Sequence, residues 1–282
     1  MPVNDQLKIA VVGVGNWGLQ HARVLAARED VDFCAVVGRD EQRVARRAAA
    51  FGVRGYTSIA AMVAAEHPDL ASVSLPNEQH FAPTLELIEA GVALFVEKPL
   101  VFDLPEADRL IAEAAARGLF FAINFNHRYA RPVAMARHAI ADGRVGDIVF
   151  ASWRFGGEGG TSHPFNNLIE TQCHGFDMLE SLCGPIASVM AEMTDMTEQG
   201  TFRTMALALR FANGAVGSLL GSYDTFLCLS GYASRRDQRH ARPNPDRGYR
   251  AALQLQRSRQ RDGRGLAGRL FQRSRPQFLS NL

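Results

Sequence analysis

Three ionisable side chains, Glu170, His174 and Asp177, stand at i, i+4 and i+7 in an otherwise apolar stretch of the sequence. This spacing places all three on one face of a helix. A carboxylate one turn before a histidine can fix its tautomer and raise its basicity, so Glu170 is a candidate for orienting His174 as a general base. The alternative is an exposed Glu–His pair that only stabilises the helix weakly, and the spacing favours neither interpretation.

Lys98 is one of only two lysines in a chain with 31 basic residues. It lies in Glu97-Lys98-Pro99, directly after an apolar run that reads as a strand. Ligands of open α/β sheets bind at the carboxyl ends of the strands, which makes Lys98 a candidate for binding a substrate oxygen. A solvated loop lysine is the alternative.

The segment Gly13-Val14-Gly15-Asn16-Trp17-Gly18 fits the pattern G-x-G-x-x-G and joins an apolar strand to a helix. In this context it predicts a dinucleotide site, where the first glycine allows the tight turn, the second lets the backbone approach the pyrophosphate, and the third lets helix pack on strand. The amide groups at the helix start would bind the phosphates. A purely structural turn is the less favoured alternative.

The next strand ends in Gly38-Arg39-Asp40, where an NAD site usually carries an acidic residue that binds the ribose 2′-hydroxyl. A guanidinium at this point would pair with a 2′-phosphate, so Gly38 and Arg39 modestly favour NADP over NAD. Asp40 could reach a ribose or cap the following helix. After a later strand, Asn77 and His80 are candidates for cofactor contact, although Asn77 is equally suited to cap a helix.

Apolar runs alternate with amphipathic stretches from residue 8 to residue 124; the runs cover 8–13, 33–38, 70–76, 93–98 and 119–124. Continuous apolar strands separated by helices are typical of a parallel sheet covered on both faces. The sequence therefore predicts an α/β, doubly wound Rossmann domain over residues 1–125.

After Arg128 the pattern predicts a helix ending at Gly143, a strand over 148–155, a glycine-rich loop and a helix over 168–182. Three strand-like runs follow, and Asn213-Gly214 between the last two is typical of a hairpin turn. We therefore expect an α+β domain with a mainly antiparallel sheet over residues 126–226, truncated where this pattern stops.

Residues 227–282 differ sharply from the rest, with 13 arginines and three aspartates against 18 basic and 26 acidic residues in 1–226. They show little periodicity, and we expect this tail to be disordered. Three origins are open: a shift of reading frame after about residue 226, which we favour, a solvated tail, or a basic arm for nucleic acid, which is the least favoured.

The overall composition, with 47% hydrophobic and 21% charged residues, is that of a globular protein. No apolar run is long enough for a membrane span, and the polar N-terminus does not read as a signal peptide. The four cysteines form no C-x-x-C pair, so neither a metal site nor a disulfide framework is indicated; they are Cys34, Cys173, Cys183 and Cys228. We expect a cytoplasmic protein.

Five motifs, in order, resemble the Gfo/Idh/MocA family, which includes glucose–fructose oxidoreductase and inositol dehydrogenase. They are GVGNWG at 13–18 in its strand context, P-N-x-x-H at 76–80, EKP at 97–99, NFNHRYARP at 124–132 and ADGRVGDI at 141–148. The resemblance extends from residue 8 to about residue 224.

The resemblance implies that Lys98 is catalytic and that Glu97 and Asn77 lie near the nicotinamide ribose. It implies an acid-x-Gly-x-His motif that this chain matches in register, with Glu170 in place of Asp and Gln172 in place of Gly. It also implies that Arg128 lies near the cleft between the domains. Lys98, Arg128, His174 and Asp177 are the expected substrate contacts.

Together these features predict an NAD(P)-dependent dehydrogenase or reductase acting on the hydroxyl/ketone pair of a sugar or cyclitol. The alternative is a dinucleotide-binding protein without catalysis, either a sensor or a copy disabled by its altered C-terminus. A homo-oligomer is expected if the second sheet is intact. The expected cofactor contacts are Gly13, Gly15, Asn16, Trp17, Gly18, Gly38, Arg39, Asn77, His80 and Glu97.

Overall fold

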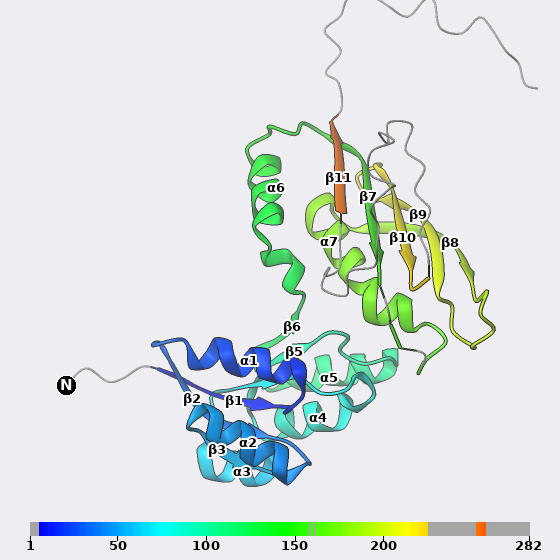
Figure 1. The fold of residues 1–282 in the computed structure, drawn as a ribbon. Helices are drawn as coiled ribbons and strands as arrows, with labels where there is room; N and C mark the ends of the chain where they lie inside the picture. The colour runs from blue at the N-terminus through cyan, green and yellow to red at the C-terminus, as the bar shows by residue number, and fades with distance from the viewer. Residues whose placement is uncertain (1–5, 158, 161, 225–251, 258–282) are drawn as a thin grey trace, which may run out of the picture.

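The computed structural model describes residues 6–157, 159–160, 162–224 and 252–257. Within these residues the chain forms two domains, each built on its own sheet (Figure 1). The first sheet takes its strands from residues 7–124 and the second from residues 148–257. No helix in the described ranges is long and apolar enough to cross a membrane.

The first sheet has six parallel strands in the order β3-β2-β1-β4-β5-β6. This order confirms the predicted doubly wound Rossmann domain. Five strands match the predicted apolar runs, and the three-residue β3 is an edge strand without such a run. The strands are β1 (Leu7–Val12), β2 (Val31–Val37), β3 (Arg54–Tyr56), β4 (Leu70–Val73), β5 (Ala93–Glu97) and β6 (Phe121–Asn124).

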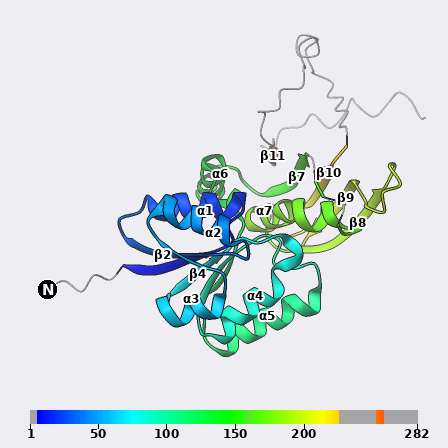
Figure 2. The same cartoon turned by 60° about the horizontal axis from the view of Figure 1, so that its bottom comes forward.

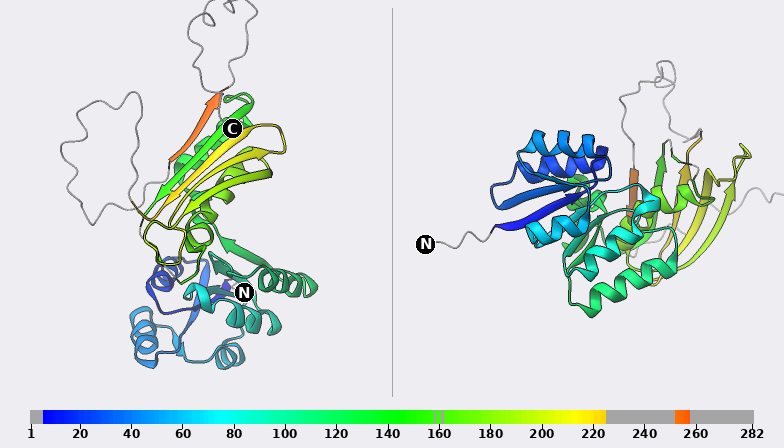
Figure 3. Two further views of the ribbon diagram at one scale, coloured as in Figure 1. Left: turned by 90° about the vertical axis from the view of Figure 1, so that its right-hand side faces the viewer. Right: turned by 90° about the horizontal axis from the view of Figure 1, so that it is seen from below.

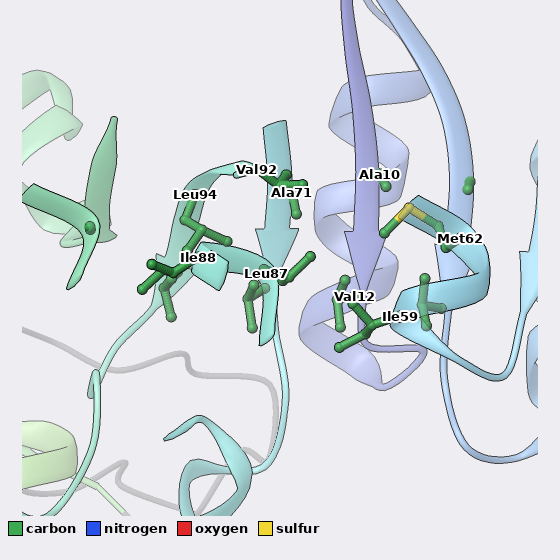
Figure 4. Close-up of a cluster of buried hydrophobic side chains, with 14 of the residues drawn as sticks. Ala10, Val12, Ile59, Met62, Ala71, Leu87, Ile88, Val92 and Leu94 are labelled. Atoms are coloured by element: carbon green, nitrogen blue, oxygen red, sulfur yellow. The ribbon is translucent and has the colours of Figure 1, made fainter. Parts of the chain in front are cut away.

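Helices cover both faces of this sheet, with α1 and α2 on one side and α3, α4 and α5 on the other (Figure 2). Alternate residues of the central strands point to the two faces; Ala10 and Val12 join the larger core with Met62 and Leu87 (Figure 4), whereas Val11 joins the smaller core. The helices are α1 (Asn16–Ala26), α2 (Glu41–Phe51), α3 (Ile59–Glu66), α4 (Phe81–Glu89) and α5 (Leu104–Ala116), with a short 3₁₀ turn η1 (Asn77–Gln79).

The second sheet has five strands in the order β11-β7-β10-β9-β8, seen side by side in Figure 3. Only the β7–β10 pair is parallel, so the predicted mainly antiparallel sheet is confirmed. Gly214, with φ +89°, lies in the turn between β9 and β10. The strands are β7 (Ile148–Gly156), β8 (Ile186–Thr194), β9 (Thr204–Phe211), β10 (Val216–Ser222) and β11 (Ala252–Arg257).

One face of this sheet packs on helix α7 (Cys173–Cys183). Trp153 of β7 and the alternate residues of β9 form the core with Met178 and Leu179 of α7. This packing fixes α7 and therefore the direction of His174. The remaining elements of the domain are the turns η2 (Asn126–Tyr129) and η3 (Asn167–Thr171) and helix α6 (Arg131–Ala141).

The expectation of a disordered tail is wrong for residues 252–257. These residues form β11, which pairs antiparallel with β7. The chain therefore adds a further strand to the second sheet after β10. The physical reason lies in the sequence Leu253-Gln254-Leu255-Gln256, whose alternation of apolar and polar residues suits a strand. The rest of the tail, together with its three proposed origins, lies outside the described residues.

Candidate active site

The glycine loop between β1 and α1 is shaped by close backbone approach. A Cβ atom at Gly13, whose φ is +125°, would lie 1.9 Å from the Ser74 carbonyl oxygen. A Cβ atom at Gly18 would lie 1.9 Å from the carbonyl oxygen of Gly13. These contacts confirm the roles predicted for Gly13 in the turn and for Gly18 in helix packing.

Gly15 differs from its neighbours because a Cβ atom there would meet nothing within 4 Å. It is the N-cap residue of α1 and makes no side-chain capping bond, and the first turn of α1 contains no acidic residue. Asn16 and Trp17, which follow, are exposed. The loop therefore offers free amide donors and open space, which fits the pyrophosphate of a dinucleotide.

At the end of β2, Arg39 Nη2 donates a hydrogen bond to Gln79 Oε1 at 2.7 Å. Asp40 accepts a hydrogen bond from the Arg43 amide at 3.0 Å and is the N-cap of α2, which selects the capping interpretation left open above. Gly38 lies under Val14, because a Cβ atom at residue 38 would be 2.6 Å from Val14 Cγ2. Because Asp40 caps α2, Arg39 is the charged group at the end of β2 that could contact a ligand.

The loop after β4 contains both Asn77 and His80, but only Asn77 is available to a ligand. Asn77 is partly exposed, lies in η1 and caps no helix. His80 is fully buried, and its two ring nitrogens lie 3.2 Å from the Leu100 carbonyl oxygen and 2.9 Å from that of Leu75. The prediction that His80 contacts the cofactor is therefore wrong; it ties the loop after β4 to the loop after β5.

Glu97 ends β5 in a polar network with side chains that lie far from it in the sequence. Its Oε1 atom accepts hydrogen bonds from His21 Nε2 at 2.9 Å and from Asn124 Nδ2 at 2.7 Å. Burial raises the pKa of Glu97, but these hydrogen bonds and the charge of Lys98 outweigh it and lower the pKa overall. Glu97 is therefore a fixed carboxylate beneath Lys98.

A hollow of about 500 Å³ runs from this network along the α1 side of the sheet. Its lining is mostly apolar and includes Ile9 and Leu70, which lie in the amino-terminal halves of their strands. It follows the sheet face rather than the carboxyl edge, where dinucleotides bind. We therefore place the candidate site at the carboxyl edge.

At that edge Lys98 reaches across to the second domain. Its Nζ atom donates a hydrogen bond to the main-chain carbonyl of Glu170 at 3.2 Å. Burial lowers the pKa values of His127 and His174, and the charge of Lys98 lowers both further. The fold thus brings together Lys98 and His174, which lie 76 positions apart in the sequence.

His174 is buried, with 7% of its surface exposed, and its Nδ1 atom has no hydrogen-bond partner within the described part of the chain. Its ring stacks face to face on His127, with ring centroids 4.1 Å apart and planes 5° apart. Burial, the neighbouring His127 and the charge of Lys98 lower the pKa of His174 to about 3. His174 is therefore neutral at physiological pH.

Glu170 does not orient His174, so that prediction is wrong. Its carboxylate accepts a hydrogen bond from the Asn166 side chain instead. The reason is that Asn167–Thr171 forms one turn of π-helix, which is wider than an α-helical turn and moves Glu170 away from the face of His174. Glu170 contributes its main-chain carbonyl, as the acceptor for Lys98.

Asp177 and Arg128 bind each other. Arg128 donates through Nε to Asp177 Oδ2 at 2.7 Å and through Nη2 to Asp177 Oδ1, so the pair is bidentate. The Asp177 side chain is 6% exposed and that of Arg128 is 42% exposed. Arg128 therefore has a free edge for a ligand, whereas Asp177 mainly anchors η2 to α7.

Gln172 explains how the chain tolerates its departure from the family motif. The side chain is fully buried, accepts a hydrogen bond from Trp153 Nε1 at 3.1 Å and donates to Asn167 Oδ1 at 3.0 Å. A Cβ atom at Gly221 would lie 2.6 Å from Gln172 Cδ, so the glycine in β10 makes room for it. Gln172 is a core residue rather than a ligand contact.

Comparison with known proteins assigns the chain to a family. Residues 7–125 match the family model GFO_IDH_MocA, described as an oxidoreductase family with an NAD-binding Rossmann fold. Residues 133–227 match the C-terminal domain of the same family. The chain belongs to the Gfo/Idh/MocA family.

Individual relatives include D-glucoside 3-dehydrogenase of Escherichia coli, which is 29% identical over 156 residues, or 54% of this chain and 44% of that enzyme. Myo-inositol 2-dehydrogenase of Thermotoga maritima is 24% identical over 75% of this chain and 67% of its own length. The chain thus spans less than half of the first of these relatives. The crystal structure of GenD2 from gentamicin A biosynthesis, in complex with NAD, has a TM-score of 0.75 and 26% identity, covering 90% of this chain and 70% of that one.

Proposed function

We propose that this chain is an NAD(P)-dependent oxidoreductase that interconverts a hydroxyl group and a ketone on a sugar or cyclitol. One observation carries the proposal: the Lys98 ammonium and the His174 imidazole converge at the carboxyl edge of a sheet whose glycine loop is open to a pyrophosphate. Both named relatives among the curated enzymes act on polyhydroxylated rings, which supports this substrate class.

The roles of the residues follow from their surroundings. When bound, the nicotinamide exchanges a hydride with the carbon that bears the reacting oxygen. Lys98 donates a hydrogen bond to that oxygen and stabilises negative charge on it. His174 takes the hydroxyl proton at Nε2, since Nδ1 is buried. In the reverse direction the same Nε2 returns the proton to the oxygen of the ketone.

The described cysteines do not offer a competing covalent mechanism. Burial raises the pKa of Cys173 beside His174 to about 12, and it raises those of Cys34 and Cys183 to about 11. These thiols stay protonated at neutral pH and are poor nucleophiles. Three free thiols, two of them buried, are also in keeping with the cytoplasmic location that we propose.

The test combines binding and turnover. NAD(H) and NADP(H) are titrated by fluorescence or calorimetry, and oxidation of a panel of sugars and inositols is followed by nicotinamide absorbance. We expect submillimolar cofactor binding and turnover of at least one polyol. Tight cofactor binding without turnover of any polyol would favour the non-catalytic alternative, and absence of cofactor binding would overturn the proposal.

We also propose that the cofactor site accepts NADP at least as well as NAD. Arg39, held by Gln79, is available to pair with a 2′-phosphate. Arg39→Gln is expected to weaken NADP binding about tenfold and to leave NAD binding within about threefold. Arg39 is a better target than Gly38, because a side chain at residue 38 would collide with Val14. A clear preference of the unmodified protein for NAD would contradict this proposal.

A homo-oligomer built on the second domain is proposed because one face of its sheet is not covered by any helix among the described residues. Helix α7 covers only one face, and on the other face of β8 Met190 is 74% exposed. Apolar residues exposed on a sheet commonly mark a protein interface. Sedimentation equilibrium is expected to show a dimer or larger species, and a monomer at micromolar concentration would contradict this.

A further inference from the structure

His127, in the turn η2 after β6, is the residue in closest ring contact with His174. The two imidazole planes are parallel to within 5°, and their centroids are 4.1 Å apart. Nothing in the spacing of the sequence singles out His127, because 47 positions separate it from His174. The contact depends on the fold, which brings η2 against α7.

In the part of the chain that the structure describes, the His174 ring lacks the hydrogen-bonded partner that usually orients a catalytic histidine. Its Nδ1 atom is buried and has no hydrogen-bond partner among the described residues, and the carboxylate expected to orient the ring, that of Glu170, is bound by Asn166. The only other ring contact that involves His174 among the described residues is the edge of Phe125, at a centroid distance of 6.1 Å. The orientation of the His174 ring therefore depends mainly on the face of His127.

His127 is itself firmly held. Its ring lies 5.8 Å from those of both Trp153 and Phe155, which are buried in the second core. The turn that carries it is fixed to α7 by the bidentate pair of the adjacent Arg128 with Asp177. A ring held on both sides in this way can serve as a rigid platform for its neighbour.

We infer that His127 is a positioning residue for His174: its ring face holds the catalytic imidazole in the orientation in which Nε2 meets the substrate hydroxyl. Stacking on His127 orients the His174 ring, as a hydrogen bond to a carboxylate orients the ring of other general bases. The inference rests on the proposed role of His174 as proton acceptor, and it adds a residue that acts through His174.

The charges around the pair make the inference testable by pH. Burial and Lys98 lower the pKa of both rings, whereas Asp177 raises that of His127 and Glu97 raises that of His174. Glu170 in η3 and Cys173 in α7 are the ionisable residues that precede His174 most closely in the chain. His127 also lowers the pKa of His174 directly. Removing the imidazole of His127 should therefore raise the pKa of His174.

Two substitutions separate stacking from protonation. His127→Phe keeps a flat ring but cannot carry a proton, and His127→Ala removes the ring. We expect His127→Ala to lower kcat about 100-fold with KM and cofactor Kd within about threefold, since misplacing a catalytic group costs this much. His127→Phe should lose less than about tenfold. His138→Phe, on the exposed face of α6, is the matched control.

The second readout does not depend on turnover. NMR titration of ¹³C-labelled histidine follows His174 in the intact protein, and its midpoint should move to higher pH in both His127 variants but not in His138→Phe. Thermal unfolding checks that each variant is folded. An unchanged His174 midpoint, or equal losses in the Phe and Ala variants, would overturn the inference. Should the intact protein turn over no polyol, the proposed function fails, while the NMR result still decides whether the rings are coupled.

Discussion

The glycine loop and the histidine pair meet at the same edge of the first sheet, but they are built in different ways. The loop is a backbone structure in which Gly18 packs on Gly13, five positions away. His174 instead depends on His127, 47 positions earlier, and lies beside Lys98 from a third element. A site built from local backbone contacts can be predicted from a short motif, whereas a site built from distant side chains needs the fold.

The largest expected effect concerns the loop itself. Gly18→Ala places a methyl group 1.9 Å from the Gly13 carbonyl oxygen, so the loop must move; we expect loss of cofactor binding and of about 1–3 kcal/mol of stability. Gly15→Ala meets nothing in the folded chain and should cost less than about 1 kcal/mol.

The same Gly15→Ala variant should nevertheless weaken cofactor binding about tenfold or more, because its methyl group occupies the space where the pyrophosphate approaches. Urea unfolding and calorimetric titration of both variants test the pair. Equal effects of the two substitutions on stability would show that the roles of the glycines have been assigned wrongly.

A smaller effect is expected on the pH dependence of stability, through the buried ring of His174. The pKa of His174 is about 3 in the folded chain and about 6.5 when unfolded, so the stability due to its neutral ring is complete above pH 6.5 and is lost as the pH falls toward 3. Between pH 7.5 and pH 5.5 the loss should be about 1 kcal/mol.

Urea unfolding at the two pH values, compared between the unmodified protein and His174→Phe, measures this loss. His174→Phe should show a correspondingly weaker pH dependence than the unmodified protein, whereas His138→Phe, whose histidine is exposed, should not differ from it in this way. The account of the buried ring fails if His174→Phe and the unmodified protein lose the same free energy.

The smallest effect should follow Glu170→Gln. Glutamine retains an oxygen for the Asn166 side chain, and the main-chain carbonyl that binds Lys98 is unchanged. Because Glu170 does not touch the His174 ring, we expect kcat to fall less than about tenfold with an unchanged pH profile. A loss of about 100-fold or more would restore Glu170 as the orienting carboxylate and contradict the π-helical geometry.

Most of the fold was predictable because it follows from short-range patterns. Apolar runs alternating with amphipathic stretches predicted five of the six parallel strands. The edge strand β3 was not predicted because Arg54–Tyr56 contains no apolar run. Strand β11 was not predicted because its alternation of apolar and polar residues is brief and is surrounded by arginines. In both cases the strand forms through pairing with a longer neighbour, which local sequence does not reveal.

The candidate site was predictable in part for the same reason. The glycines, Lys98 and His174 could be found from motifs and strand ends. The role predicted for Glu170 was wrong because its i, i+4 spacing to His174 places the two on one face only in an α-helix, and the chain forms a π-helical turn here. The cofactor contact predicted for His80 was wrong because the burial of this residue depends on the loop after β5. His21, Gln79 and His127 were missed because their partners lie far away in the sequence.

The central claim is that Lys98 and His174 act on one oxygen, and a double-mutant cycle tests it most directly. Lys98→Ala and His174→Ala should each lower kcat about 100-fold or more, with cofactor Kd nearly unchanged, and Lys8→Ala serves as the control for loss of a lysine. If both residues serve one oxygen, the double variant should be little worse than either single variant. Losses that multiply, or near-normal turnover of His174→Ala, would contradict the account.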